Sequence, residues 1–169
     1  MGRVLDGIIS PMQNAFLGGH CMADNINILQ ELLKHYERKR TSPRCFIKID
    51  FRKAFDFVQW TFMRHLLLLL GFPNKFVHLV MTCVETASYS VAVNGELFGF
   101  FPSRCGVRQG DPLSPYLFII CMEYLFRMLS LASQNPSFRF HPKYKVFGLS
   151  HLCFTDDIIL LCRGDMNSV

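Results

Sequence analysis

Two adjacent aspartates, Asp156 and Asp157, lie between two apolar runs close to the end of this sequence. The runs are His151–Phe154 and Ile158–Leu161, and two apolar runs joined by a short polar break are typical of a β-hairpin, here with the aspartates in its turn. Anionic side chains beside buried strands are unfavourable unless a cation lies between them. Asp50 presents the same problem, because it ends a β-prone segment that precedes a helical pattern. We therefore expect two strand ends that offer three carboxylates to a metal ion.

A glycine-rich polar loop, Gly106–Pro115, separates the first aspartate from the pair and runs into the apolar segment Tyr116–Met122. Each feature alone allows a simpler interpretation, because an aspartate after a strand is commonly a turn or helix-capping residue. The paired aspartates alone would be interpreted as a solvated turn. The order of carboxylate, glycine-rich loop and paired carboxylates is more specific than any of its parts.

The composition indicates a packed domain with a mildly basic surface. The chain has 169 residues, and its hydrophobic content of 50% is ample for a core, which excludes a disordered protein. The net charge of +5 is compatible with a polyanionic partner but is far smaller than that of a basic tail. Tyr116–Met122 is much shorter than the roughly 18 residues that span a bilayer, and the N-terminus lacks the apolar core of a signal peptide. We therefore expect no membrane partner and an intracellular protein, in the nucleus or the cytoplasm, with no targeting signal evident.

The cysteines do not form a recognisable metal or disulfide pattern. There are seven of them, with no Cys-x-x-Cys pair, and the six histidines are equally dispersed. His151 and Cys153 fall on the same face of one expected strand, yet no second pair completes a ligand set, so packing roles are expected for both. We predict reduced core thiols and no zinc site.

Hydrophobic periodicity and turn signals predict an α+β fold in one continuous body, without internal repeats. Asn94-Gly95 is the strongest short-range hairpin signal, and Gly71 with Pro73 predicts the end of one helix and the start of the next. Ser114 is a candidate helix cap. The expected elements are helices over 24–40, 58–70, 73–87 and 115–132, and strands over 45–50, 89–93 and 97–101 and in the final hairpin.

Five sequence boxes together resemble one enzyme family. They are Ile47–Asp56 (Ile-Lys-Ile-Asp-Phe-Arg-Lys-Ala-Phe-Asp), the loop Arg-Gln-Gly-Asp-Pro-Leu-Ser-Pro over 108–115, the paired aspartates, Asn94-Gly95 followed by Gly99-Phe100-Phe101, and Phe140–Lys143. With these boxes the chain resembles a reverse transcriptase, and most closely the polymerase of plant LINE-type (non-LTR) retrotransposons. The resemblance covers essentially the whole chain.

The resemblance implies a polymerase palm, an antiparallel sheet covered by helices, with part of the fingers. We expect residues 1–169 to form a partial reverse transcriptase domain, with about 1–44 fingers-like and about 45–169 palm. No segment resembles a thumb, an endonuclease or an RNase H domain. The chain is therefore expected to be a fragment of a retrotransposon polyprotein.

The activity that the resemblance implies is extension of a DNA primer on an RNA template with deoxynucleoside triphosphates. Two Mg²⁺ ions, about 3.5–4 Å apart, stabilise the attacking and leaving oxygens in this chemistry, and Mn²⁺ is an alternative. Carboxylate oxygens suit Mg²⁺. Carried over from the family's motif positions, Asp50 and Asp156 bridge both metals, and Asp157 supports the metal on the primer side.

The resemblance also implies a nucleotide-binding set on both sides of the glycine-rich loop. Phe55 resembles the aromatic steric gate that excludes a 2′-hydroxyl, although its spacing from Phe51 also fits a core aromatic. Backbone N–H groups of 52–54 could form an anion-binding nest, and Asp111 is expected to cap the loop before the helix. The expected nucleotide-binding residues are Phe51, Arg52, Lys53, Ala54, Phe55, Gln109 and Gly110, with Arg108 on template or phosphate.

Two positions depart from the family's pattern. Gly18-Gly19-His20 stands where these polymerases usually carry glycine followed by a phosphate-binding arginine, and Thr155 replaces the usual alanine before the aspartates. The departures suggest a partial or decayed copy of the element. The alternative function is therefore a noncatalytic palm fragment that acts at most as an RNA-binding module; a splicing maturase is a further alternative, but it would require a basic helical domain after the palm.

Overall fold

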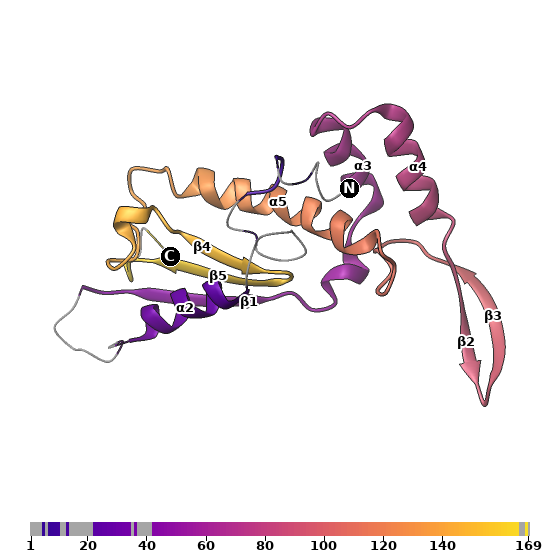
Figure 1. Cartoon of the computed structure of the whole chain (residues 1–169), viewed down its shortest axis with the longest axis horizontal. Coiled ribbons are helices and arrows are strands. Elements are labelled where there is room, and N and C mark those ends of the chain that lie inside the picture. Colours follow the sequence, from indigo (N-terminus) through magenta and orange to yellow (C-terminus); the bar gives the residue numbers. More distant parts are fainter. Residues whose placement is uncertain are drawn as a thin grey trace. The chain divides into compact units, whose positions relative to one another are not determined.

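The computed structural model describes residues 5, 7–10, 13, 22–34, 36, 42–165 and 168, and the chain divides into two compact units (Figure 1). Unit 1 is drawn from Met1–Arg52 and Met122–Val169, and unit 2 is Lys53–Cys121. One boundary falls between Arg52 and Lys53, and the other falls inside the long helix α5 (Ser114–Ala132). The predicted boundary between a fingers-like segment (about 1–44) and a palm (about 45–169) coincides with neither boundary of the two units. That division stays a prediction.

The centre of unit 1 is a three-stranded antiparallel sheet with the order β1-β5-β4. Its strands are β1 (Cys45–Asp50), β4 (His151–Phe154) and β5 (Asp157–Cys162). The register joins Cys45 to Cys162 at one end and Asp50 to Asp157 at the other. The central strand β5 therefore pairs with β1 on one side and with β4, its partner in the last hairpin, on the other. Both pairings are antiparallel, as the α+β prediction requires.

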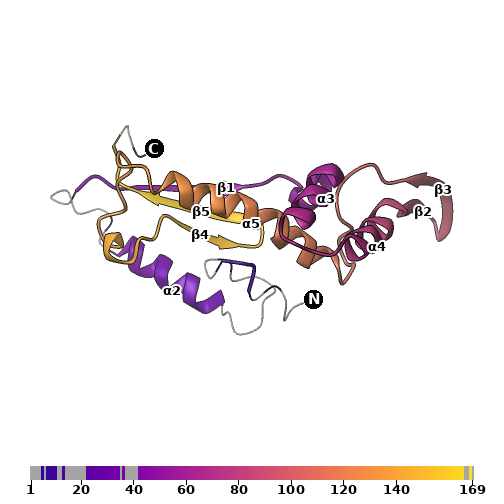
Figure 2. The ribbon, with the colours of Figure 1, turned by 90° about the horizontal axis from the view of Figure 1, so that it is seen from above.

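Helices cover both faces of this sheet, with α2 (Met22–Leu33) on one side and α5 on the other (Figures 1 and 2). Leu32 of α2 packs with Leu152 and Leu161, whereas Phe126 of α5 stacks on His151 with ring centroids 5.4 Å apart. Neighbouring residues of a strand point to opposite faces, so His151 and Leu152 reach different helices. A strand covered on both faces favours a continuous apolar run, and β5 has one.

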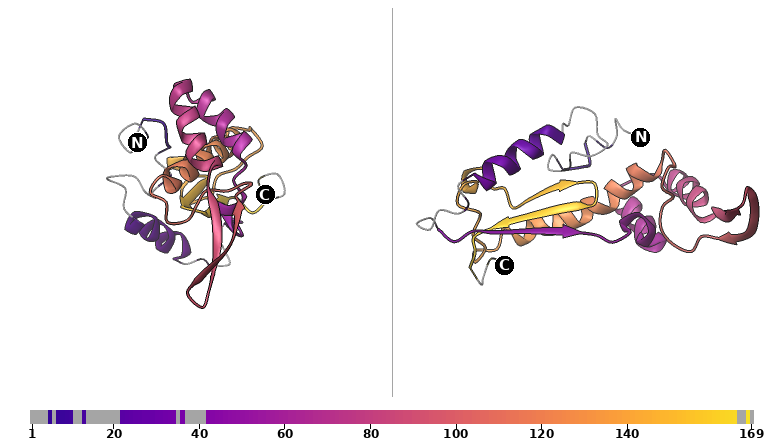
Figure 3. Two further views of the ribbon diagram at one scale, coloured as in Figure 1. Left: turned by 90° about the vertical axis from the view of Figure 1, so that its right-hand side faces the viewer. Right: turned by 90° about the horizontal axis from the view of Figure 1, so that it is seen from below.

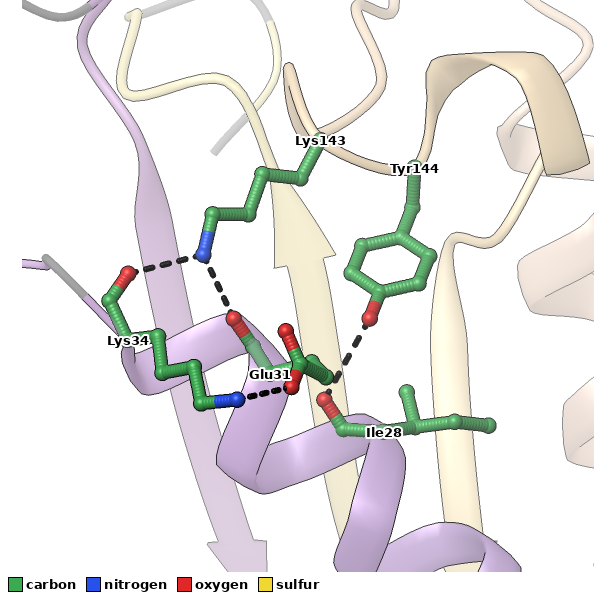
Figure 4. Close-up of polar contacts among 5 residues, drawn as sticks. All are labelled: Ile28, Glu31, Lys34, Lys143 and Tyr144. Carbon is green, nitrogen blue, oxygen red and sulfur yellow. Dashed lines mark hydrogen bonds and ion pairs between the residues drawn. The ribbon is translucent and has the colours of Figure 1, made fainter.

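The C-terminal end of α2 is held by residues that precede β4 (Figure 4). The Lys143 ammonium donates hydrogen bonds to the carbonyls of Glu31 and Lys34, and the Tyr144 hydroxyl lies 3.5 Å from the carbonyl of Ile28. A cation at the last carbonyls of a helix satisfies orphan acceptors and interacts favourably with the helix dipole. The helix ends at Leu33 rather than near residue 40, so the predicted end was wrong; residues 37–41 lie outside the described part of the chain.

Unit 2 contains two short helices followed by a hairpin (Figure 3). Gly71, at φ 83°, follows α3, and Pro73 precedes α4, as predicted. Asn94 at φ 52° and Gly95 at φ 88° form the predicted hairpin turn. The elements of unit 2 before α5 are the 3₁₀ helix η1 (Ala54–Phe57), α3 (Trp60–Leu69), α4 (Asn74–Glu85), β2 (Ser88–Val93) and β3 (Glu96–Pro102).

Within the described residues, α5 is the single helix long and apolar enough to cross a bilayer by length and composition. Its residues Leu117 to Ile120 are each at most 2% exposed. Glu123, also buried, pairs with Arg127 at 2.8 Å. Burial of the apolar side chains inside the protein is the usual arrangement of a core helix.

Candidate active site

The first part of the candidate site is the carboxylate end of the sheet in unit 1. Asp50 is the last residue of β1, and Asp157 is the first residue of β5 and its register partner. Residues directly opposite in an antiparallel pair have Cβ atoms about 4.5–5.5 Å apart, and like charges at such positions destabilise the pair. Asp156 lies beside them in the turn with Thr155. The prediction that the turn carries both aspartates was wrong for Asp157, because the ladder extends to that residue.

Lys48 supplies positive charge to this cluster. Its Nζ lies 3.0 Å from Asp157 Oδ1, and it shares a strand face with Asp50, two residues away. The pKa of Lys48 is raised first by the hydrogen bond and charge of Asp157, and further by the charges of Asp50 and Asp156. All three carboxylates therefore act on one ammonium. The sequence prediction missed Lys48, although its spacing of two from Asp50 on a strand was an available signal.

The donor chemistry of this cluster suits a hard divalent cation, since all three groups are carboxylates. The geometry fits less completely. Over the described residues, no group of three His, Cys, Asp or Glu side chains is close enough to hold a metal ion. In this arrangement Asp157 pairs with the Lys48 ammonium, with Nζ and Oδ1 3.0 Å apart.

A hollow of about 370 Å³ borders the carboxylate cluster inside unit 1. Lys48 and Asp157 are its charged groups, and Phe154 lies on its wall. Ile26 and Leu29 of α2 supply further apolar lining. A helix of the segment predicted as fingers-like thus lines the same hollow as one of the candidate ligands.

Thr155 adopts a left-handed backbone conformation, with φ 56°. That conformation is uncommon for any non-glycine residue and is an outlier for a β-branched one. The residue joins β4 to Asp156, so the strain is located where the candidate ligand leaves the strand.

A second group of predicted site residues lies in unit 2 and is described by itself. Phe55 of η1 is half-buried and stacks on Phe118 of α5, with ring centroids 4.2 Å apart and planes 15° apart. Phe118 is 2% exposed, so the ring of Phe55 rests on a fixed core residue. The sequence allowed two interpretations of Phe55, a steric gate or a core aromatic. The stacking on Phe118 gives Phe55 a core partner, and its role as a gate stays a prediction.

Backbone hydrogen bonds join the start of the glycine-rich loop to the segment around η1. Gly106 N donates to the carbonyl of Val58 at 2.8 Å, and Val107 N donates to that of Phe55 at 2.9 Å. The indole N–H of Trp60 donates to the carbonyl of Gly106 at 2.8 Å. A Cβ on Gly106, whose φ is 83°, would lie 2.6 Å from the Asp56 carbonyl oxygen, so the site requires glycine. The sequence prediction did not single out these contacts.

The loop itself borders a hollow of about 410 Å³ in unit 2, lined in part by Arg108 and Gln109. The Arg108 guanidinium lies over the Tyr89 ring, 5.7 Å from its centroid. Gly110, at φ 89°, has no heavy atom within 4 Å of its Cβ position. The carboxylate of Asp111 accepts a hydrogen bond from Leu113 N at 2.8 Å, which confirms its predicted capping role.

The predicted site residues thus divide between the two units. Asp50, Phe51, Arg52, Asp156 and Asp157 belong to unit 1. Unit 2 contains Lys53, Ala54, Phe55, Arg108, Gln109 and Gly110. Lys53 has a left-handed backbone at φ 53°, while the anion-binding role of 52–54 stays a prediction. Gly18-Gly19-His20 lies outside the described residues.

Comparison with known proteins identifies the family. Residues 3–168 match the family described as "Reverse transcriptase (RNA-dependent DNA polymerase)". The chain belongs to this family. It is a reverse transcriptase domain of the kind found in non-LTR retrotransposons, as its relatives indicate.

Two relatives are polyproteins of R2 elements. The chain is 30% identical over 139 residues to the "Retrovirus-related Pol polyprotein from type-1 retrotransposable element R2" of Popillia japonica, a match that covers 80% of this chain and 22% of that protein. It is 37% identical over 123 residues to the corresponding type-2 polyprotein, R2DM, of Drosophila melanogaster, covering 70% of this chain and 11% of that protein. The reverse transcriptase domain therefore spans a small part of these relatives.

A solved structure confirms the fold class. The domain is similar to an apo telomerase from Candida tropicalis with a TM-score of 0.60 and 17% sequence identity, over 91% of this chain and 30% of that chain. At this identity the likeness shows the fold alone, an α+β fold of the polymerase palm type. The predicted fold class is confirmed.

Proposed function

We propose that this reverse transcriptase domain catalyses RNA-directed DNA synthesis, in which a DNA primer is extended on an RNA template with deoxynucleoside triphosphates. The observation that carries the proposal is the alignment of Asp50 with Asp157 across the β1–β5 ladder, with Asp156 in the adjoining turn. All three carboxylates of the motif are retained, and each of them raises the pKa of the Lys48 ammonium.

Asp50, Asp156 and Asp157 are proposed to hold Mg²⁺, with Mn²⁺ as a substitute. Bound there, the cations would supply charge stabilisation at the attacking and leaving oxygens of the phosphoryl transfer. A cation on Asp157 competes with the ammonium of Lys48, which lies 3.0 Å from the same carboxylate. Loading of the site is therefore expected to require release of Lys48 from Asp157.

The nucleotide and template roles are proposed for the residues of the other group. Gln109 and Arg108 border the same hollow and offer an amide and a guanidinium to an incoming nucleotide or template. Phe55 is proposed as the gate against the 2′-hydroxyl, because its stacking on Phe118 holds the ring rigidly.

The element is proposed to be of the plant LINE type, on the motif Ile47–Asp56, the Arg-Gln-Gly-Asp-Pro-Leu-Ser-Pro loop and Phe140–Lys143. The domain is proposed to work as part of a polyprotein, since it spans 22% and 11% of its R2 relatives. Further segments of such a protein would be its partners, together with the RNA template and the DNA primer.

One specific observation favours a second candidate, a noncatalytic palm that binds RNA. Within the described residues, the carboxylates do not form a three-ligand metal group, and Lys48 neutralises one of them. The two candidates differ in whether purified protein makes DNA.

The test is primer extension on poly(A)·oligo(dT) with Mg²⁺, comparing the parent protein with Asp156→Asn. Glu96→Gln is the control, because it removes a carboxylate from an exposed strand outside the site. Extension by the parent and the control, but not by Asp156→Asn, is expected. Absence of extension by folded parent protein, with RNA binding retained, would refute the catalytic proposal for this chain and favour the second candidate.

A further inference from the structure

A second hollow in unit 1, of about 480 Å³, lies at the end of the sheet opposite the carboxylates. It is lined by Phe138, Arg139, Phe140, Lys145 and Arg163, among others. Phe140 belongs to the Phe140–Lys143 box, which the candidate active site does not use, and Arg139 directly precedes that box. We call these five residues the basic–aromatic hollow.

Main-chain contacts hold the hollow against the sheet. Arg163 N donates to the carbonyl of Arg139 at 2.8 Å, and Phe140 forms an isolated antiparallel bridge with Cys162, the last residue of β5. Arg139 N donates in turn to Ser168 Oγ at 2.9 Å. Arg139, Phe140 and Arg163 are therefore held at the C-terminal end of the central strand β5.

The charge of the hollow is positive. Arg163 is paired with Asp165, with Nε and Oδ2 3.5 Å apart. Arg139 and Lys145 are exposed, and in the described part of the chain neither forms an ion pair. Two uncompensated cations thus face an open hollow.

The aromatic residues give the hollow a second kind of contact. Phe138 and Phe140 meet edge to face, with centroids 5.1 Å apart and planes 84° apart. Both rings are half-buried, and both line the hollow. Aromatic faces set among cations match the two requirements of single-strand binding, base stacking and neutralisation of phosphates. An acidic peptide would use the cations but not the rings.

We propose that the basic–aromatic hollow binds a single strand of nucleic acid, with bases on Phe138 and Phe140 and phosphates on Arg139, Lys145 and Arg163. The six residues of β1 span about 17 Å, so the hollow lies roughly that far along the sheet from Asp50 and Asp157. It is therefore a contact separate from the carboxylates. Binding of a strand to this hollow requires neither a metal ion nor DNA synthesis. The proposal therefore goes beyond the proposed polymerase activity, and the two can be tested separately.

The experiment measures binding of fluorescein-labelled 12-nucleotide oligo(U) by fluorescence anisotropy, in EDTA, over a series of salt concentrations. Arg139→Gln/Lys145→Gln is compared with Lys75→Gln/Arg104→Gln, which removes two exposed positive charges from unit 2. Each phosphate contact contributes about 0.7 to the slope of log K against log salt for a single strand, so the first pair should lower the slope by about 1.4 and weaken binding roughly tenfold. The control pair should change neither by as much.

Phe138→Leu tests the stacking contact, since leucine keeps apolar bulk but has no ring. Roughly fivefold weaker binding with an unchanged salt slope is expected. Far-UV circular dichroism checks the fold. If Phe138→Leu unfolds, the comparison of the two charge pairs still tests the proposal.

Three outcomes would overturn the proposal. They are equal losses for the two charge pairs, undiminished binding by folded Phe138→Leu, and equally effective competition by polyglutamate, which has no bases. Parallel titration with a 12-nucleotide oligo(dT) distinguishes the two sources of such a strand: equal affinity assigns the hollow to single strands of either kind, and tighter oligo(U) binding assigns it to RNA. Failure here with successful primer extension would leave the polymerase proposal intact.

Discussion

Gly106→Ala is the substitution whose effect follows most directly from the structure. Gly106 has φ 83°, and an added Cβ would lie 2.6 Å from the carbonyl oxygen of Asp56 and 2.8 Å from its carbonyl carbon and Cα. Gly71 has the same φ of 83°, but its Cβ position has no neighbour within 4 Å. Gly71→Ala is therefore a matched control that carries the backbone penalty without the clash.

The two penalties can be separated. A left-handed conformation costs a non-glycine residue about 1–2 kcal/mol, which applies to both variants. At Gly106 the clash is with main-chain atoms, so relief requires movement of the loop away from the η1 segment. That movement disturbs the hydrogen bonds from Gly106 N to Val58 and from Val107 N to Phe55, each worth about 0.5–1.5 kcal/mol. We expect a loss of unfolding free energy of about 2–5 kcal/mol for Gly106→Ala and about 1–2 kcal/mol for Gly71→Ala.

The assay is urea unfolding followed by the fluorescence of Trp60, the single tryptophan of the chain. Its indole N–H donates to the Gly106 carbonyl at 2.8 Å, so its emission reports on the region that the substitution disturbs. With an m value of about 2 kcal/mol/M, the midpoint of Gly106→Ala should lie about 1 M below that of Gly71→Ala. Equal midpoints for the two variants would refute the claim that the loop packs against Asp56.

Three further predictions concern unit 1. Thr155→Asn should raise the unfolding free energy by about 1 kcal/mol in urea titrations, because asparagine tolerates the left-handed φ of 56° better than a β-branched residue; an unchanged or lower value would argue against strain in this turn. Lys48→Met should tighten Mn²⁺ binding in calorimetry, because it removes the ammonium 3.0 Å from Asp157, with Lys75→Met as control; equal dissociation constants would exclude competition by Lys48. Burial lowers the pKa of His151 from its usual 6.5, so between the folded and unfolded values the unfolded chain binds more protons, and stability should fall as pH drops below 6.5. His151→Gln should flatten this dependence between pH 7.5 and 5.5, and a slope unchanged by the substitution would assign it to other groups.

The elements that were predictable from sequence are those determined by neighbouring residues. Asn94-Gly95 predicts its hairpin because both residues tolerate positive φ, and Gly71 with Pro73 predicts the break between two helices. The strand Cys45–Asp50 was predicted to the residue. In these cases the physical cause lies within a few positions of the effect.

Contacts between distant segments were not predictable in this way. The early end of α2 accompanies hydrogen bonds from Lys143, a residue far along the chain. The pairing of Asp50 with Asp157, and with it the position of Lys48, depends on the register between β1 and β5. The turn at Thr155-Asp156 determines only the register between β4 and β5. The motif order therefore predicted three candidate carboxylates, whose role stays a prediction, but not which of them the ladder would pair.

The pairing of β1 with β5 also has a consequence for the order in which the chain folds. β1 leaves the ribosome before the whole of Lys53–Cys121, yet its ladder partner is made only after that unit and α5. Local contacts form faster than those that close long loops, so the helices and hairpin of the intervening unit can form first. Until β5 is made, the edge of β1 that will pair with β5 is open to wrong partners. The carboxylate end of the sheet is therefore expected to assemble late, and chains interrupted before β5 would carry the first aspartate of the motif on a strand without its native neighbour.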